Sequence, residues 1–406
     1  MAGQLSNAEH IASRPFAVWT LGGLFAANAV GLDSPLVAVP EIATYFDVGQ
    51  GGAQLIIVLF LAGYAAGHIP VGILGDRFGR RPVILIGLAL AALLSLIAVF
   101  APTFEVLLIA RFLQGIATCA AGLLSRAVIR DIASGARASK LTSSAMMVLA
   151  VLIIVTPLLA SYLLYVFDWR HVLMVTFLYV VILFWLTVIF IPETMHTERH
   201  SNHPWQQFRL SLDAFLKSAQ SVRASLLGAL AFATFFIFSA AGASLVVDVY
   251  KLPAASFGIL FALMAFIQLA ASAYNSRIVA KQGTAFVLKR AAVMSGIGIA
   301  LSIGGFVSGY VPLTLFLLTA AAFTIAHALT LPNSIALTLD PLPKTAGFTS
   351  AIHGMLQTGI AAIAGVVVSL AYDATAETVL RIYSAFGLVT LIVLISGRRL
   401  FLSPAE

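Results

Sequence analysis

The stretch Gly72-Ile-Leu-Gly-Asp-Arg-Phe-Gly-Arg-Arg81 decides how this chain folds, because it is a short basic turn between two long apolar runs. The runs cover residues 55–74 and 83–99, and a helix of roughly 20 residues crosses a bilayer. Glycines at positions 75 and 79 permit a tight reversal. The three arginines favour the cytoplasmic side of the membrane. The stretch therefore predicts a cytoplasmic turn between two membrane helices.

The composition indicates the same class of protein. Hydrophobic residues make up 61% of the 406 residues and charged residues 10%, whereas about a quarter of a soluble chain is charged. The net charge of +7 comes from residues scattered over short loops, which does not favour nucleic-acid binding. The single cysteine, Cys119, excludes an intrachain disulfide and a cysteine-built metal site. We expect an all-α polytopic membrane protein whose first membrane helix directs insertion, since the first 14 residues lack the features of a secretory signal.

We expect twelve transmembrane helices. They lie near residues 16–44, 53–74, 82–101, 104–127, 141–167, 171–192, 224–248, 254–276, 287–308, 311–336, 346–370 and 377–397. With both termini in the cytoplasm, only Arg170, Lys251 and Arg381 fall outside, and Arg111 lies within the membrane. This distribution of basic residues supports the assigned orientation.

The longest polar interval separates two halves of six helices. We predict an N-terminal six-helix bundle over residues 1–192, a cytoplasmic linker over 193–223 and a C-terminal six-helix bundle over 224–406. The linker contains apolar residues at helical spacing, which predicts an amphipathic helix on the inner membrane surface. These residues are Trp205, Phe208, Leu212, Phe215 and Leu216. Its histidines, His196, His200 and His203, are interpreted as solvated loop residues and not as a metal site.

The two halves show a weak internal similarity. Residues 277–290 form a second basic turn, which is expected to lack the glycine–aspartate core of the first. Pseudo-repeats of this kind are typical of two bundles that rock about a site at the membrane midplane. We therefore expect pseudo-symmetric bundles.

Two motifs carry a resemblance to a known family. Gly72, Leu74, Asp76, Arg77, Gly79, Arg80 and Arg81 match the pattern GxLaDrxGrR, and Leu107, Arg111, Gln114 and Gly115 match lxxxRxxqG. The chain resembles the major facilitator superfamily, in which these patterns lie between helices two and three and in helix four. The resemblance implies the major facilitator fold and transport by alternating access.

Within this superfamily the chain most resembles the drug:proton antiporters of the Bcr/CflA-like group. Asp33 with Leu36 and Pro40, the segment Arg126-Ala-Val-Ile-Arg-Asp131 and the ending Pro192-Glu-Thr194 carry this resemblance. The fifth helix departs from it, because Thr156-Pro157-Leu-Leu-Ala160-Ser161 replaces the usual GPxxGG. The missing glycines weaken the inference of outward antiport.

Charges in the membrane are costly and therefore indicate function. Asp33 lies where Pro35 and Pro40 interrupt the first helix, and a carboxyl group removed from water retains its proton more readily, as a proton carrier requires. The alternative is an aspartate at the outer helix end. The resemblance links Arg111 to proton transfer. A guanidinium near a carboxylate would keep the carboxylate ionised. The alternative is a structural arginine that bonds helix carbonyls. Gln114 is expected on the same helix face as Arg111.

Further polar and aromatic residues are candidates for a substrate cavity or a gate. The cavity candidates are Gln114, His327, His353, Gln357, Phe232 and Phe236, with packing histidines and lipid-facing phenylalanines as the alternatives. Tyr274 and Asn275 end the eighth span. The candidate cytoplasmic gate comprises Gly72, Gly75, Asp76, Arg77, Gly79, Arg80, Arg81, Arg126 and Arg130; alternatively, the last two only anchor their helix end.

These observations favour a proton-coupled exporter of small amphipathic drugs or metabolites. The alternatives are a symporter for a nutrient or siderophore-like metabolite and a membrane receptor or assembly subunit that does not transport. No catalytic set stands out, so we expect no enzyme activity and no cofactor besides the proton gradient. The expected partners are a small-molecule substrate, protons and the lipid bilayer, without nucleic acid. The chain is expected to be a monomer in a bacterial inner membrane.

Overall fold

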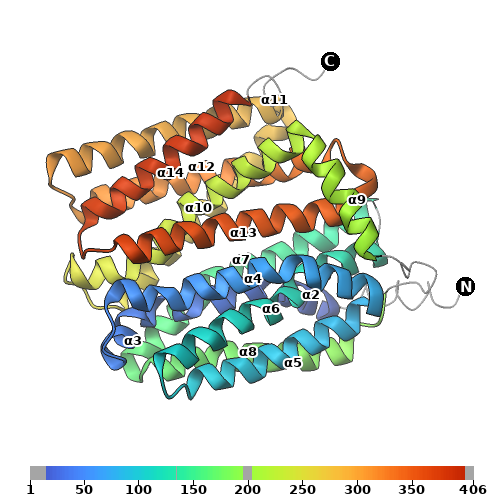
Figure 1. The fold of residues 1–406 in the computed structure, drawn as a ribbon, viewed down its shortest axis with the longest axis horizontal. Coiled ribbons are helices and arrows are strands. Elements are labelled where there is room, and N and C mark those ends of the chain that lie inside the picture. The colour runs from blue at the N-terminus through green and yellow to red at the C-terminus, as the bar shows by residue number, and fades with distance from the viewer. Residues whose placement is uncertain (1–14, 134, 195–203, 398–406) are drawn as a thin grey trace, which may run out of the picture. The chain divides into compact units, whose positions relative to one another are not determined.

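The computed structural model describes residues 15–133, 135–194 and 204–397, and Figure 1 shows that its regular structure is helical. No strand occurs in those ranges, so the predicted all-α class is confirmed. The helices are α2 (Pro15–Asp33), η1 (Ser34–Ala38), α3 (Val39–Tyr45), α4 (Gln50–Phe78), α5 (Arg80–Val99), α6 (Phe104–Ile132), α7 (Gly135–Val166), α8 (Trp169–Phe190), α9 (Pro204–Lys217), α10 (Ala219–Asp248), α11 (Ser256–Ser308), α12 (Leu313–Leu339), η3 (Pro343–Thr345), α13 (Ala346–Ala371) and α14 (Ala376–Ser396).

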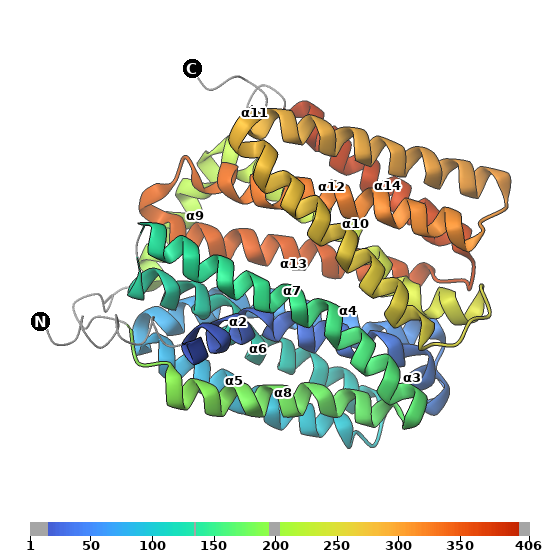
Figure 2. The same cartoon turned by 180° about the vertical axis from the view of Figure 1, so that it is seen from behind.

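Eleven helical segments in the described ranges are long and apolar enough to cross a membrane. One of them, α11, has 53 residues. At about 1.5 Å per residue it is more than twice as long as the hydrocarbon core is thick. Gly283 interrupts α11 with φ 75° and ψ 168°, and the helix folds back there (Figure 2). Since α11 contains two of the expected spans, the predicted count of twelve is confirmed.

The first span is broken where its prolines predict. Helix α2 ends at Asp33, the 3-10 turn η1 follows, and α3 begins at Val39. Pro35 and Pro40 cannot donate backbone hydrogen bonds, so a continuous α-helix is interrupted here. Asp33 therefore occupies a helix end inside the first span.

Contacts between residues divide the chain into two units. Unit 1 combines Met1–Pro35 with Leu59–Leu210, and unit 2 combines Leu36–Val58 with Ser211–Glu406. The segment that joins the first span to the second thus clusters with the second half of the chain. The domain limits at residues 192 and 223 stay a prediction.

In unit 1, α2 and α5 each pack against several other helices. Helix α5 lies against α6 and α8, while α2 lies against α6 and α7. The residues of its apolar core include Leu21, Leu24, Ile84, Leu88, Val180 and Leu183. Gly63 and Gly115 bring α4 and α6 together, because a β-carbon at either position would collide with a backbone carbonyl of the other helix. This close approach places α4 beside the polar residues of α6.

In unit 2, α10 lies against α12 and α13, and α11 lies against α12 and α14. Segment 36–58 is attached to this group by hydrogen bonds. Gln54 Nε2 donates to Ser244 Oγ of α10 over 3.3 Å, and Ser369 Oγ of α13 donates to the Gly51 carbonyl over 2.6 Å. A β-carbon at Gly51 would collide with the Ser369 carbonyl. The glycine therefore permits the beginning of α4 to approach α13.

The predicted amphipathic helix of the linker is present as α9. Phe208 and Phe215 are buried, whereas Trp205 and Leu216 remain exposed. Asp213 accepts a hydrogen bond from Lys217 on its polar side. Its position on a membrane surface stays a prediction, as does the orientation of the termini. The three linker histidines lie outside the described residues.

Candidate functional site

A buried arginine on α6 is the centre of the polar contacts in unit 1. Thr103 caps this helix by accepting a hydrogen bond from the Val106 amide. The Arg111 side chain is completely buried. Its Nη1 donates to Gln114 Oε1 over 2.6 Å, and its Nη2 donates to the Gly31 carbonyl over 2.7 Å. The expectation that Arg111 and Gln114 share a helix face is confirmed, because residues three apart are neighbours on a helix.

Two further residues complete this cluster. The Arg111 guanidinium carbon lies 4.4 Å from the ring centre of Phe60 on α4, an arrangement that stabilises a cation removed from water. Gln114 Nε2 donates to Ser95 Oγ over 2.5 Å, and Ser95 Oγ donates to the Ala91 carbonyl of α5. Arg111 is therefore connected to α2, α4 and α5. Sequence reasoning missed Phe60 and Ser95, although Ser95 is the one hydroxyl residue in the apolar run 83–99.

Asp33 is buried at the end of α2, with 7% of its surface exposed. It lies two residues after Gly31, whose carbonyl accepts the hydrogen bond from Arg111. The next residue, Ser34, shares a hydrogen bond of 2.8 Å with Thr176 of α8. Both contacts fix the backbone around Asp33. The connection from Arg111 toward Asp33 thus includes the backbone of α2.

The basic turn of unit 1 is a second polar cluster, in which carboxylates surround Arg80. Arg80 Nη1 lies 2.5 Å from Asp76 and its Nε lies 3.5 Å from Asp131. The Glu193 carboxylate accepts hydrogen bonds from the backbone amides of Arg80 and Arg81 over 3.0 and 3.1 Å. These bonds satisfy amides at the beginning of α5, which the helix itself cannot pair.

The remaining gate candidates of unit 1 lie around this cluster. Arg126 is stacked on Phe25 at 5.6 Å, and Arg77 lies 5.2 Å from the Phe78 ring. Arg130 is exposed near the end of α6. Gly75 allows close packing on α6, since a β-carbon there would come within 2.6 Å of the Leu124 side chain. Gly72 is less crowded, with Leu123 at 3.9 Å from such a β-carbon.

The cavity candidates of unit 2 lie in two different environments. His327 on α12 is buried between Phe232 and Phe235, with ring centres 5.5 and 5.0 Å away. Its Nδ1 is buried and makes no hydrogen bond within the described part of the chain. Phe236 is also buried, one turn of α10 after Phe232. The structure therefore brings His327 and the phenylalanines of α10 together.

His353 lies in a polar contact of α10, α12 and α13. Its Nδ1 and Ser225 Oγ are 3.2 Å apart, and Ser225 Oγ is 3.1 Å from Thr338 Oγ1. Gln357 follows one helical turn later and is half-buried. His353 therefore joins three helices of unit 2 through hydroxyl groups, as a packing histidine does.

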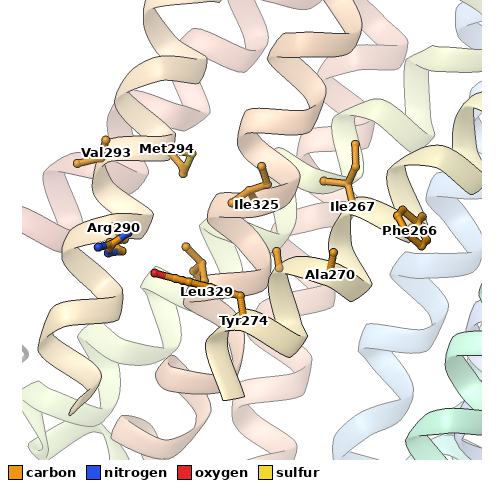
Figure 3. Close-up of a pocket in the computed structure, with 10 residues that line it drawn as sticks. Phe266, Ile267, Ala270, Tyr274, Arg290, Val293, Met294, Ile325 and Leu329 are labelled. Atoms are coloured by element: carbon orange, nitrogen blue, oxygen red, sulfur yellow. The ribbon is translucent and has the colours of Figure 1, made fainter. Parts of the chain in front are cut away.

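A pocket of about 520 Å³ lies between the two halves of α11 and α12. Figure 3 shows the side chains that surround it, which come from all three of these segments. The lining residues are Phe266, Ile267, Ala270, Ala271, Tyr274, Arg290, Val293, Met294, Ile325 and Leu329. Of the aromatic residues considered from the sequence, Tyr274 lines this pocket. The predicted cavity residues do not.

The comparisons with known proteins agree on one family. Residues 20–366 match the family model of the Major Facilitator Superfamily. A bicyclomycin resistance protein homolog of Haemophilus influenzae is 28% identical over 367 residues, which cover 88% of this chain and 90% of that protein. Multidrug resistance protein MdtL of Shewanella oneidensis is 31% identical over 147 residues, which cover 36% of this chain and 37% of MdtL.

Solved structures show the same fold. The nucleoside transporter NupG superposes with a TM-score of 0.73 at 15% identity, covering 94% of this chain and 98% of NupG. A D-xylose-proton symporter superposes with a TM-score of 0.70 at 17% identity, covering 93% and 96% of the two chains. At these identities the likeness concerns the fold alone.

Proposed function

Because this chain belongs to the major facilitator superfamily, a family of multi-pass membrane transporters, we propose that it exports small amphipathic drugs or metabolites in exchange for protons. The full-length similarity to a bicyclomycin resistance protein homolog supports a drug as the exported molecule. A bacterial inner membrane with both termini in the cytoplasm fits the distribution of its basic residues. The alternatives of uptake and of a receptor without transport find no comparable support.

The observation that carries proton coupling is a buried carboxyl group, Asp33, two residues from the Gly31 carbonyl that the buried Arg111 binds. A membrane protein retains charged side chains in its interior where they serve transport. Arg111 donates a hydrogen bond to the Gly31 carbonyl. If protonation of Asp33 moves the end of α2, this hydrogen bond to Arg111 would therefore change. Protonation drives transport only if the inward-facing and outward-facing states differ in their affinity for the proton.

Transport in this scheme alternates between two states of the membrane helices. In the state open to the outside, Asp33 takes up a proton; in the state open to the cytoplasm, it releases the proton as substrate binds. Gln114 holds the Arg111 guanidinium in place by accepting its hydrogen bond. Ser95 in turn fixes the Gln114 side chain, because its hydroxyl accepts a hydrogen bond from Gln114 Nε2. Arg111 acts in this proposal as a positioning residue for the Asp33 segment.

The test uses the purified chain reconstituted into liposomes that contain bicyclomycin. Release of bicyclomycin should accelerate when the outside solution is made more acidic than the liposome interior, because protons then move inward as the drug moves outward. Asp33→Asn keeps the shape of the side chain and should abolish this acceleration. Asp47→Asn is the matched control, since Asp47 is an exposed aspartate and should leave the acceleration unchanged.

Three outcomes would contradict the proposal. A wild-type chain that releases bicyclomycin at the same rate with and without the gradient rejects proton coupling. Persistent gradient dependence in Asp33→Asn rejects the role of Asp33. Accumulation of the drug by a pump-deficient bacterial host that expresses the chain, instead of increased resistance, rejects export in favour of uptake.

A further inference from the structure

The pocket in unit 2 has the form of an apolar groove open to the surroundings of the helices. Ala270 contributes little side-chain volume on one side, and Ile325 and Leu329 of α12 form the floor (Figure 3). Phe266 and Val293 at its rim have 63% and 58% of their surface exposed. Exposed apolar residues of this kind in a membrane-spanning helix suit contact with acyl chains. The groove therefore lies where lipid can enter it.

One end of the groove is polar and positively charged. Both Tyr274, just before the basic segment 277–290, and Arg290, at the end of that segment, line it there. This segment contains Arg277, Lys281, Lys289 and Arg290 and no acidic residue. By the distribution of basic residues it lies on the cytoplasmic side, where anionic lipid headgroups attract cations.

The Arg290 guanidinium is held by aromatic rings and not by a carboxylate. It lies 4.6 Å from the ring centre of Phe286 and 5.9 Å from that of Tyr274. No ion pair involves Arg290 in the described part of the chain. A stacked guanidinium keeps its N–H groups at its edge, where they match the oxygens of a phosphate. The charge at the end of the groove is therefore available to an anion.

We propose that this groove binds an anionic phospholipid of the cytoplasmic leaflet. One acyl chain lies along Phe266, Ile325 and Leu329, and the phosphate lies at Arg290 with the Tyr274 hydroxyl as a second donor. The volume of the groove falls within the range of about 300–1,000 Å³ that is usual for small-molecule sites. This lipid site shares no residue with the proposed proton pathway of Asp33 and Arg111 and does not depend on the proposed transport function.

Native mass spectrometry of the purified full chain tests the proposal by titration with phosphatidylglycerol and, separately, phosphatidylcholine. The wild-type chain should bind phosphatidylglycerol more tightly. Arg290→Gln should weaken phosphatidylglycerol binding about fivefold, since a basic residue near the membrane contributes about 1 kcal/mol to attraction of anionic lipid. Lys289→Gln is the matched control, because it removes the same charge from a neighbouring exposed residue outside the groove and should therefore weaken binding clearly less than Arg290→Gln does.

A second variant tests the apolar part of the site. Ala270→Trp places a large ring in the groove and should weaken the binding of phosphatidylglycerol, while Arg290→Lys should retain part of it. Unchanged thermal unfolding temperatures will establish that these variants fold. Equal affinity of the wild-type chain for both lipids, equal effects of Arg290→Gln and Lys289→Gln, or unaltered binding by Ala270→Trp would each overturn the proposal. Competition by glycerol phosphate as effective as that by the intact lipid would also overturn it.

Discussion

The turn around Gly79 in unit 1 and the turn around Gly283 in unit 2 reverse the chain with the same backbone conformation. Gly79 has φ 97° and ψ 159°, and Gly283 has φ 75° and ψ 168°. These angles lie in a region that residues with a β-carbon rarely occupy. The second turn lacks the glycine–aspartate core of the first, as its sequence indicates, but it has a glycine of its own, Gly283, at the point of reversal.

The two turns differ in the partners of their cations. In unit 1, Asp76, Asp131 and Glu193 bind the side chain or backbone of Arg80 and Arg81. In unit 2, no ion pair involves residues 277–290 within the described ranges. The comparison shows that two turns with the same backbone conformation differ in what their cations contact. One turn is bound to neighbouring helix ends, and the cations of the other make no ion pair in the described part of the chain.

The largest expected effect concerns the two glycines. Gly79→Ala should destabilise the protein by about 3 kcal/mol, because the backbone is strained and the new β-carbon would come within 2.6 Å of the Glu193 carboxylate. Gly283→Ala should cost about 1–2 kcal/mol, since a β-carbon at this position would meet no atom within 4 Å and strain acts alone. Thermal unfolding in detergent measures both. Equal losses would remove the distinction between a packed and an open turn.

The second effect concerns the cations. Arg80→Ala should cost about 2 kcal/mol, between the values for exposed and buried ion pairs, because Asp76 and Asp131 lose their shared partner. Lys281→Ala in the second turn is the control and should change stability by less than about 0.5 kcal/mol. Thermal unfolding measures the loss of stability in each variant, and a drug-export assay shows whether transport changes with it. Similar behaviour of the two variants would show that the carboxylates of unit 1 contribute nothing specific.

The third effect concerns the carboxylate that binds the beginning of α5. Glu193→Gln should cost about 1.5 kcal/mol, because an amide offers one acceptor where the carboxylate accepts from two backbone amides. Asp213→Asn removes the same charge from the exposed pair with Lys217 and should cost about 0.5 kcal/mol at most. Hydrogen exchange at the Arg80 and Arg81 amides checks the cause. Exchange as slow as in the wild-type chain would contradict it.

The smallest effect concerns Thr194, whose hydroxyl donates to Asp131 over a long 3.4 Å. Thr194→Val should cost about 0.5 kcal/mol, because a bond of this length is weak. Thr176→Val, which removes a 2.8 Å bond to the buried Ser34, should cost about 1 kcal/mol or more. Thermal unfolding of the two variants compares them. A larger loss from Thr194→Val would mean that Asp131 depends on this hydroxyl.

The sequence locates many residues of the candidate site but does not show which residues they contact. Arg111 and Gln114 are expected on one face because their spacing fits a helical turn. The Gly31 carbonyl and Ser95 hydroxyl are 80 and 19 residues away from their partners, so spacing along one helix says nothing about them. The surroundings of His327 and His353 illustrate the same point. Only packing shows that the first lies between aromatic rings and the second beside a hydroxyl group.

The amino-acid sequence alone determined the all-α membrane class, the number of spans, the basic turn after residue 72 and the break at Asp33. These properties follow from local hydropathy, helix length, and the effects of proline and glycine on the backbone. The tertiary structure decided which carboxylates bind Arg80, that Glu193 reaches the beginning of α5 from 113 residues away, and that Arg290 is left without an acidic partner in the described part of the chain. Such pairings depend on which helix ends packing brings together, and contacts between distant segments leave no periodic signal in a single sequence.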